Sequence, residues 1–219
     1  MHFSDMPYFE WGVGFATQKK TLFPQRQMRP DVVKRREAWK KAFWHIVLNR
    51  LTFLDESGVN LAQTRLYGRA PSNERVNDYV PDARFERKSI IVAMKLNGQM
   101  SSLFFSGTMN GKLFVQYIKK FLSQILVDGD IVVLDNCTAH KVAGVKEAIE
   151  ACGAKVLYLP KYSPDLNPVE LLWSKVKAVL RREKARTHDA LEKALKLALD
   201  SVCADDILGW FKHCGYCEC

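Results

Sequence analysis

The pattern of apolar and polar positions predicts five β-strands. They are expected at residues 51–55, 89–96, 101–106, 130–135 and 155–159, with Ser57-Gly58 closing the first. In the first, Leu51, Phe53 and Asp55 alternate with Thr52 and Leu54. The fourth and fifth are continuous apolar runs, which are typical of strands buried on both faces. Asn97-Gly98 lies between the second and third runs, and this dipeptide in that place indicates a hairpin.

Apolar residues at helical spacing predict six helices around these strands. They are expected at residues 32–49, 111–125, 143–152, 168–185, 187–202 and 204–212. Asp31 is the expected N-cap of the first helix, and Asn167, followed by Pro168, is that of the fourth. A hairpin followed by alternating helices and strands indicates an α/β fold. We expect a mixed sheet with helices on both faces and extra helices at the C-terminus.

Two segments fall outside this pattern of helices and strands. Residues 1–30 carry glycine, proline and basic side chains at irregular spacing, which predicts a basic arm or linker ahead of one domain at 31–219. Residues 60–88 are polar and basic and are also interrupted by glycine and proline. We expect them to form an excursion between the first strand and the hairpin.

The charge distribution favours a polyanionic partner. The chain has 219 residues and a net charge of +9, of which residues 1–50 contribute +6 through ten basic and four acidic side chains. Nucleic acid is the simplest partner for such a chain, and a soluble protein with a basic face is the alternative. No apolar run is long enough for a membrane span and no secretory signal is recognisable. We therefore expect a cytoplasmic protein without a membrane partner, associated with the nucleoid when bound to DNA, whose cysteines are thiols.

Three acidic residues at the ends of predicted elements are the candidate chemistry. Asp55 is expected to end the first strand, Asp135 to end the fourth, and Glu170 to lie in the first turn of the fourth helix. The carboxyl ends of neighbouring strands converge on the crevice in which open α/β sheets bind ligands. Three carboxylates there repel one another unless a cation that prefers oxygen ligands, such as Mg²⁺ or Mn²⁺, binds between them. Taken singly, each could instead be a turn or helix-capping residue.

Five stretches of sequence give the chain a family resemblance. They are FLDESG (53–58), RLYGRAP (65–71), GDIVVLDNCTAH (129–140), YLPKYSPDLNPVELLWSKVK (158–177) and FKHCGY (211–216). Through them the chain resembles the DDE transposases of the insertion-sequence 630 group, within the mariner superfamily. The 34 residues between Asp135 and Glu170 (170 − 135 − 1) match that family's spacing of its last two acidic residues.

The resemblance implies an RNase H-like fold and a two-metal DNA transposase. Asp55, Asp135 and Glu170 would be the catalytic residues and would hold two Mg²⁺ or Mn²⁺ ions, about 3.5–4 Å apart in sites of this kind. The implied enzyme is an endonuclease that excises an insertion sequence and joins its ends to target DNA, working as a homodimer. Full-length relatives carry an N-terminal helix-turn-helix region, so residues 1–30 would be its remnant. The alternatives are an RNase H-like nuclease that cuts without joining and a non-catalytic DNA-binding remnant.

Several neighbouring residues are expected to support the three acidic ones. Glu56 should point to the opposite face of its strand, because side chains alternate with a period of two. Asn136 and His140 follow the second acidic residue, and His140 is expected either to touch the scissile phosphate or a metal-bound water, or simply to pack. Trp173 is expected in the core. The expected contacts to DNA phosphates, which could also be a solvated face, are Arg65, Arg69, Lys161, Lys175, Lys177, Arg181 and Arg182.

Overall fold

The strands form one mixed sheet in the order β3-β2-β1-β4-β5. The computed structural model describes residues 25–43, 48–65, 67–81 and 88–217. The strands within them are β1 (Leu51–Val59), β2 (Lys88–Lys95), β3 (Met100–Ser106), β4 (Ile131–Leu134) and β5 (Lys155–Tyr158). β1 pairs antiparallel with β2 and parallel with β4, and β2 and β3 form the predicted hairpin. The predicted mixed sheet is confirmed.

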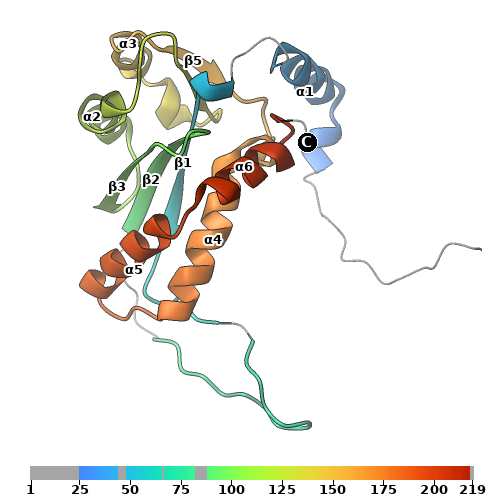
Figure 1. Cartoon of the computed structure of the whole chain (residues 1–219), viewed down its shortest axis with the longest axis vertical. Coiled ribbons are helices and arrows are strands. Elements are labelled where there is room, and N and C mark those ends of the chain that lie inside the picture. The colour runs from blue at the N-terminus through green and yellow to red at the C-terminus, as the bar shows by residue number, and fades with distance from the viewer. Residues whose placement is uncertain (1–24, 44–47, 66, 82–87, 218–219) are drawn as a thin grey trace, which may run out of the picture.

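Helices cover both faces of this sheet, as predicted. In the described residues they are α1 (Pro30–Phe43), α2 (Gly111–Lys120), α3 (Val145–Glu150), α4 (Pro168–Glu183), α5 (His188–Asp200) and α6 (Ala204–His213). Figure 1 shows α2 and α3 on one side of the sheet and α4, α5 and α6 on the other. None of the described helices is long and apolar enough to cross a membrane.

Alternate residues of the central strands build two separate cores. Phe53 of β1 and Val133 of β4 are fully buried in the cluster that includes the apolar face of α4. Leu54 and Leu134 are fully buried in the opposite cluster, with α2 and α3. Because successive side chains of a strand point to opposite faces, residues with the parity of Phe53 and Val133 face α4.

β1 is longer than the sequence analysis predicted. It continues past Ser57 and Gly58 to Val59, because β2 pairs with it along this whole length. Asp55 therefore lies in the middle of β1 and not at its end, which corrects the expected boundary. Asp135 directly follows β4, as predicted.

The segment ahead of the sheet also differs from the prediction. α1 begins at Pro30, so Asp31 lies in its first turn and is not its N-cap. The helix is described only to Phe43, and residues 48–50 form a short 3-10 turn instead of continuing it. Of the expected arm, residues 1–24 lie outside the described residues. Its described end, Gln25–Met28, forms a 3-10 turn in which Gln27 is buried.

The described part of the excursion contains no helix or strand and extends beyond the body of the fold (Figure 1). Its base is nevertheless fixed. Arg186 donates hydrogen bonds to the carbonyl oxygens of Leu61 at 2.7 Å and Gln63 at 3.0 Å. Lys184, at the end of α4, forms a salt bridge with Asp78 on the returning limb. The excursion thus leaves the body from a defined position.

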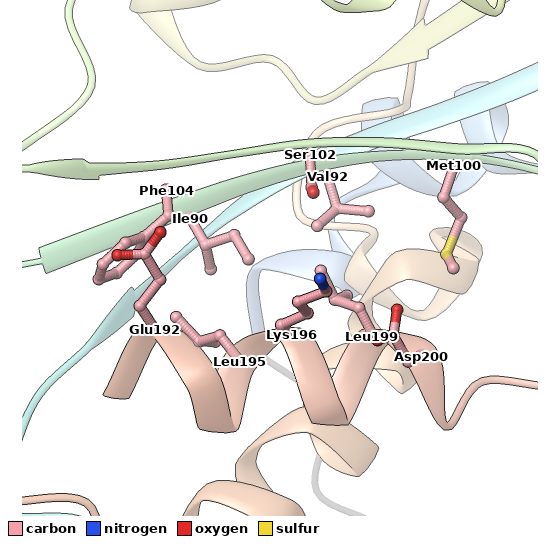
Figure 2. A pocket seen from close by; sticks show the side chains of 10 residues that line it. All are labelled: Ile90, Val92, Met100, Ser102, Phe104, Glu192, Leu195, Lys196, Leu199 and Asp200. Atoms are coloured by element: carbon pink, nitrogen blue, oxygen red, sulfur yellow. The ribbon is translucent and has the colours of Figure 1, made fainter. Parts of the chain in front are cut away.

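α5 covers its face of the sheet incompletely. A groove of about 440 Å³ lies between this helix and the β2–β3 hairpin. Figure 2 shows Leu195 and Leu199 of α5 pointing toward Ile90 and Val92 of β2 across the groove. None of the three predicted acidic site residues lines it. The groove is therefore separate from the candidate site.

Candidate active site

The register of the sheet brings Asp55 and Asp135 side by side. β1 and β4 pair in parallel with Phe53 opposite Val133. Continuing this register by two residues places Asp55 beside Asp135, at the point where β4 has ended and β1 goes on. Both acidic residues share the parity of Phe53 and Val133, so both side chains point toward the α4 side of the sheet.

Glu170 reaches the same place from α4. Asn167 caps this helix as predicted, since its side-chain oxygen accepts a backbone N–H of the first turn at 3.2 Å, and Pro168 is the first helical residue. Glu170 lies in that first turn. Together with Asp55 and Asp135 it lines a pocket of about 510 Å³. The structure thus brings the three predicted acidic residues to one pocket.

Trp173 bonds to the site directly, which the sequence analysis missed. Its side chain is buried, as expected for a core residue, but its Nε1–H donates to Oδ2 of Asp55 at 3.0 Å. The available signal was its spacing of three residues from Glu170, which puts both on one face of α4. Burial, and after it the negative charge of Glu170, raises the pKa of Asp55 to about 7. The indole N–H partly offsets this cost of the ionised form.

His140 holds Asp135 from the protein interior. Its Nδ1 lies 2.6 Å from Oδ1 of Asp135, and the backbone N–H of Cys137 donates to the same oxygen at 2.8 Å. Burial by itself would raise the pKa of Asp135, but these hydrogen bonds, that of His140 first, keep the pKa below its usual value. The His140 ring is only 1% exposed and packs against Phe114. This burial favours packing, one of the two alternatives left open for His140, over a contact with the scissile phosphate or a metal-bound water.

The other two predicted supporting residues lie on different sides of the sheet. Asn136 lines the pocket, where its side-chain N–H donates to the carbonyl oxygen of Leu159 and its side-chain oxygen accepts from Lys141 at 2.6 Å. It thereby ties the ends of β4 and β5 together. Glu56 points to the opposite face, as predicted, and lines a separate pocket. The structure therefore keeps Asn136 at the site and removes Glu56 from it.

The basic residues nearest the pocket have different roles. Lys161 lines the pocket, and Lys177 lies close enough to Glu170 for its positive charge to oppose the rise in that residue's pKa. Lys175 turns away from the pocket. Its ammonium group donates to a carbonyl oxygen at the end of α5 at 2.8 Å and to the carboxylate of Asp206. In this structure Lys175 thus joins α4 to the helices that follow it, and its expected phosphate contact stays a prediction.

The remaining predicted DNA contacts lie away from the pocket. Arg65 and Arg69 are exposed on the excursion. Arg181 is half-buried and Arg182 is exposed in the last turn of α4, where Arg182 bonds to Glu183. None of these four arginines lines the pocket. Any contact that they make with DNA lies outside this pocket.

The donor set suits a hard divalent cation, provided that the carboxylates draw together around it. Among the described residues, no three His, Cys, Asp or Glu side chains already form a metal-binding cluster. Burial comes first among the causes that raise the pKa of Asp55 and Glu170, and the charges of neighbouring carboxylates add to it. A cation removes this repulsion, and Mg²⁺ and Mn²⁺ prefer carboxylate oxygens. Trp173 and His140 each hold one aspartate oxygen, as residues behind metal ligands commonly do.

Comparisons with known proteins agree with this geometry. A family model described as DDE superfamily endonuclease matches residues 50–192, which include all three acidic residues. A comparison with curated proteins finds no match.

Solved structures of Mos1 transposase share the fold. Its paired-end complex with the left transposon end matches with a TM-score of 0.73 and 16% identity over 92% of this chain, and its strand transfer complex with 0.69 and 16% over 92%. The Mos1 catalytic domain matches with a TM-score of 0.61 and 16% identity over 91%. This chain spans 64% of the first, 63% of the second and 94% of the third. The likeness identifies the fold as the predicted RNase H-like one.

Proposed function

The chain belongs to the DDE superfamily of endonucleases, and from this we propose that it is the catalytic domain of a transposase of the insertion-sequence 630 group. It cuts DNA at the ends of an insertion sequence and joins these ends to target DNA. The observation that carries the proposal is the convergence of Asp55, Asp135 and Glu170 on one pocket. The Mos1 structures that share the fold include a complex with a transposon end and a strand transfer complex, which supports both kinds of DNA substrate.

In this proposal Asp55, Asp135 and Glu170 hold two divalent metal ions. Mos1 complexes with Mn and with Mg share the fold, which supports the use of either metal. Bound ions would supply a nucleophilic oxygen at neutral pH and stabilise charge on the phosphate. The side chains of the protein itself hold the three carboxylates in place. Trp173 and His140 orient the two aspartates, and the cap of α4 sets the place of the glutamate.

Lys161 and Lys177 are the proposed contacts to phosphates beside the reacting one. Lys161 lines the pocket and Lys177 lies near Glu170. Contacts of this kind position the backbone and weaken with salt but carry no base specificity. We propose that DNA phosphates outside the pocket are contacted by four arginines, Arg65, Arg69, Arg181 and Arg182.

The active assembly in this proposal is a homodimer, and the excursion reaches the second copy. Tyr67 and Tyr79 are each 90% exposed, and Val76 is 52% exposed. Exposed apolar groups gathered on one segment mark an interaction surface. The limbs approach closely at Gly68, where a Cβ would lie 2.7 Å from Val76. Light scattering on the complex with a cut DNA end should give two chains, and a mass of one chain would remove the dimer from the proposal.

A strand-transfer assay tests the proposed activity. The substrates are a plasmid target and a pre-cut DNA end taken from the sequence that flanks the gene. With Mg²⁺, joined product is expected from the wild type and from Asp205→Asn, a control at an exposed carboxylate of α6. No joined product is expected from Asp135→Asn. Nicking without joining would make the protein a nuclease, and DNA binding without either reaction would make it a non-catalytic remnant.

A further inference from the structure

The segment ahead of the sheet is bonded to the loop that leads into α4. Gln27, which is 8% exposed, donates from Nε2 to the carbonyl oxygen of Tyr162 at 2.6 Å and to Oδ1 of Asp165 at 3.3 Å. The guanidinium group of Arg26 lies over the ring of Tyr162, 5.7 Å from its centroid. Gln27 thus holds Tyr162 through its backbone, and Arg26 holds it through its ring.

Arg36 of α1 makes the strongest of these contacts. Its two terminal nitrogens donate to the two carboxylate oxygens of Asp165 at 2.9 and 2.6 Å. The side chains are only 17% and 31% exposed, so solvent screens this two-pronged pair less than it would a surface pair. Burial works against the ionised carboxyl, yet the hydrogen bonds and charge of Arg36 keep the pKa of Asp165 below its usual value. The pair is therefore a fixed point between α1 and the loop.

Trp39, one turn further along α1, reaches the loop through a relay. Its Nε1–H donates to the hydroxyl oxygen of Tyr216 at 3.1 Å, and that hydroxyl donates to the carbonyl oxygen of Leu166 at 2.6 Å. Trp39 and Tyr216 are both buried. The loop is consequently held from this side at residues 162, 165 and 166.

This loop is both a wall of the pocket and the lead into Glu170. Residues 160–164 line the pocket together with Asn167 and Glu170. Tyr162 has a φ of 58°, a left-handed conformation that a residue with a side chain keeps only when its surroundings hold it. The loop ends at Asn167, whose carbonyl oxygen accepts the backbone N–H of Glu170 at 3.1 Å. A shift of the loop therefore shifts the glutamate.

We propose that α1 and the turn before it act as a brace that fixes this loop, and that Gln27 and Arg36 are positioning residues for Glu170. The role of Glu170 as a metal ligand rests on the proposed function, whereas the bracing rests on the contacts alone. Loss of the brace lets the loop leave its left-handed turn and lets Glu170 move away from the two aspartates. Metal binding and the rate of cutting then fall, while DNA binding changes little because Arg36 does not line the pocket.

The test compares Arg36→Ala with Arg35→Ala, a matched control on the same helix whose side chain is 60% exposed and lies 4.0 Å from the carboxylate of Asp31. Arg36→Lys keeps the charge but loses the two-pronged geometry and should fall between them. For each variant we would measure hydrogen exchange of the loop amides, Mn²⁺ affinity by electron paramagnetic resonance, the KM and kcat for nicking, and thermal unfolding. Glu170→Gln and the wild type test the proposed function within the same series.

The expected result for Arg36→Ala is faster exchange confined to residues 160–171, Mn²⁺ binding weakened by about 10-fold and a similar fall in kcat with KM unchanged. Loop exchange and Mn²⁺ affinity equal to those of Arg35→Ala would overturn the brace. Faster exchange throughout the fold would overturn it as well, because that would show a general loss of stability. If the wild type binds no Mn²⁺, the proposed function fails, and the loop exchange alone then decides whether Arg36 holds the loop.

Discussion

Asp55 in β1 and Asp135 directly after β4 hold equivalent positions in the continued register of these parallel strands, 80 residues apart in the chain (135 − 55). The same offset joins Phe53 to Val133, the last pair of the β1–β4 ladder, so the acidic pair continues the register of a fully buried pair beyond the end of β4. The central strands therefore do two things at once. Their buried residues fix the register, and the register fixes the spacing of two carboxylates.

The first prediction concerns the stability that the fold loses through this acidic pair when no metal is bound. The pKa of Asp55 is raised to about 7 from 3.8, so ionised Asp55 destabilises the fold at pH 8. In EDTA at pH 8, Asp55→Asn should be more stable than the wild type by at least about 1.4 kcal/mol, the equivalent of one pKa unit. Thermal unfolding measures this. Mg²⁺ should raise the melting temperature of the wild type and not of Asp55→Asn, and equal stabilisation of both would contradict the account.

A second prediction isolates the indole N–H at the site. Trp173→Phe keeps an aromatic ring in the core but removes the donor to Oδ2 of Asp55. Mn²⁺ affinity should fall by about 10-fold, since residues behind a ligand commonly contribute that much. Trp210→Phe, a change of the same kind in α6, is the control and should leave the affinity unchanged. The indole would have no orienting role if both variants bound Mn²⁺ like the wild type.

A buried ion pair far from the site leads to a third prediction. The ammonium of Lys95 lies 2.6 Å from Oδ2 of Asp130, and both side chains are almost fully buried. Lys95→Met leaves the carboxylate without its main partner, so the free energy of unfolding should fall by about 3–5 kcal/mol. Denaturant titration checks this. The double variant Lys95→Met/Asp130→Leu should recover most of the loss, and a single variant as stable as the wild type would show that Asp130 tolerates the change.

The sequence predicts most of the fold and the elements that carry the three acidic residues, because both depend on local patterns. The apolar run before Asp135 identifies β4, and Asn167-Pro168 marks the start of α4 with Glu170 in its first turn. The predicted end of β1 was wrong, because only its pairing with β2 carries that strand past Gly58.

Contacts between distant parts of the chain were beyond the reach of sequence patterns. Trp173 reads as a core residue, and its bond to Asp55 spans 118 positions. The bond of Arg36 to Asp165 spans 129 positions. Lys175 is one of several basic residues in its helix, but the packing of α4 against α6 brings it into contact with Asp206. Such partners depend on how the elements pack, and the pattern within each element does not contain that information.

The fourth prediction is a pH dependence at the loop. The pKa of Asp165 is lowered in the folded protein, so its ionised form stabilises the fold above the carboxyl's ordinary pKa, and this stability is lost as the pH falls through the lowered value. At pH 7, Asp165→Asn should lower the free energy of unfolding by about 1.5 kcal/mol. The difference between wild type and variant should shrink as the pH drops below about 4. A difference that stays constant down to pH 2 would show that the charge of Asp165 is not its cause.

The most direct test of the central claim is metal-dependent nicking of supercoiled plasmid by the wild type, Asp55→Asn, Asp135→Asn and Glu170→Gln, with Asp205→Asn as the control. The account predicts nicking by the wild type and the control in Mg²⁺ or Mn²⁺ and none in EDTA. Each of the three site variants should be slower by about 100-fold or more, because each loses charge at the reacting phosphate. Asp135→Asn cutting at the wild-type rate would contradict the account and place the chemistry elsewhere.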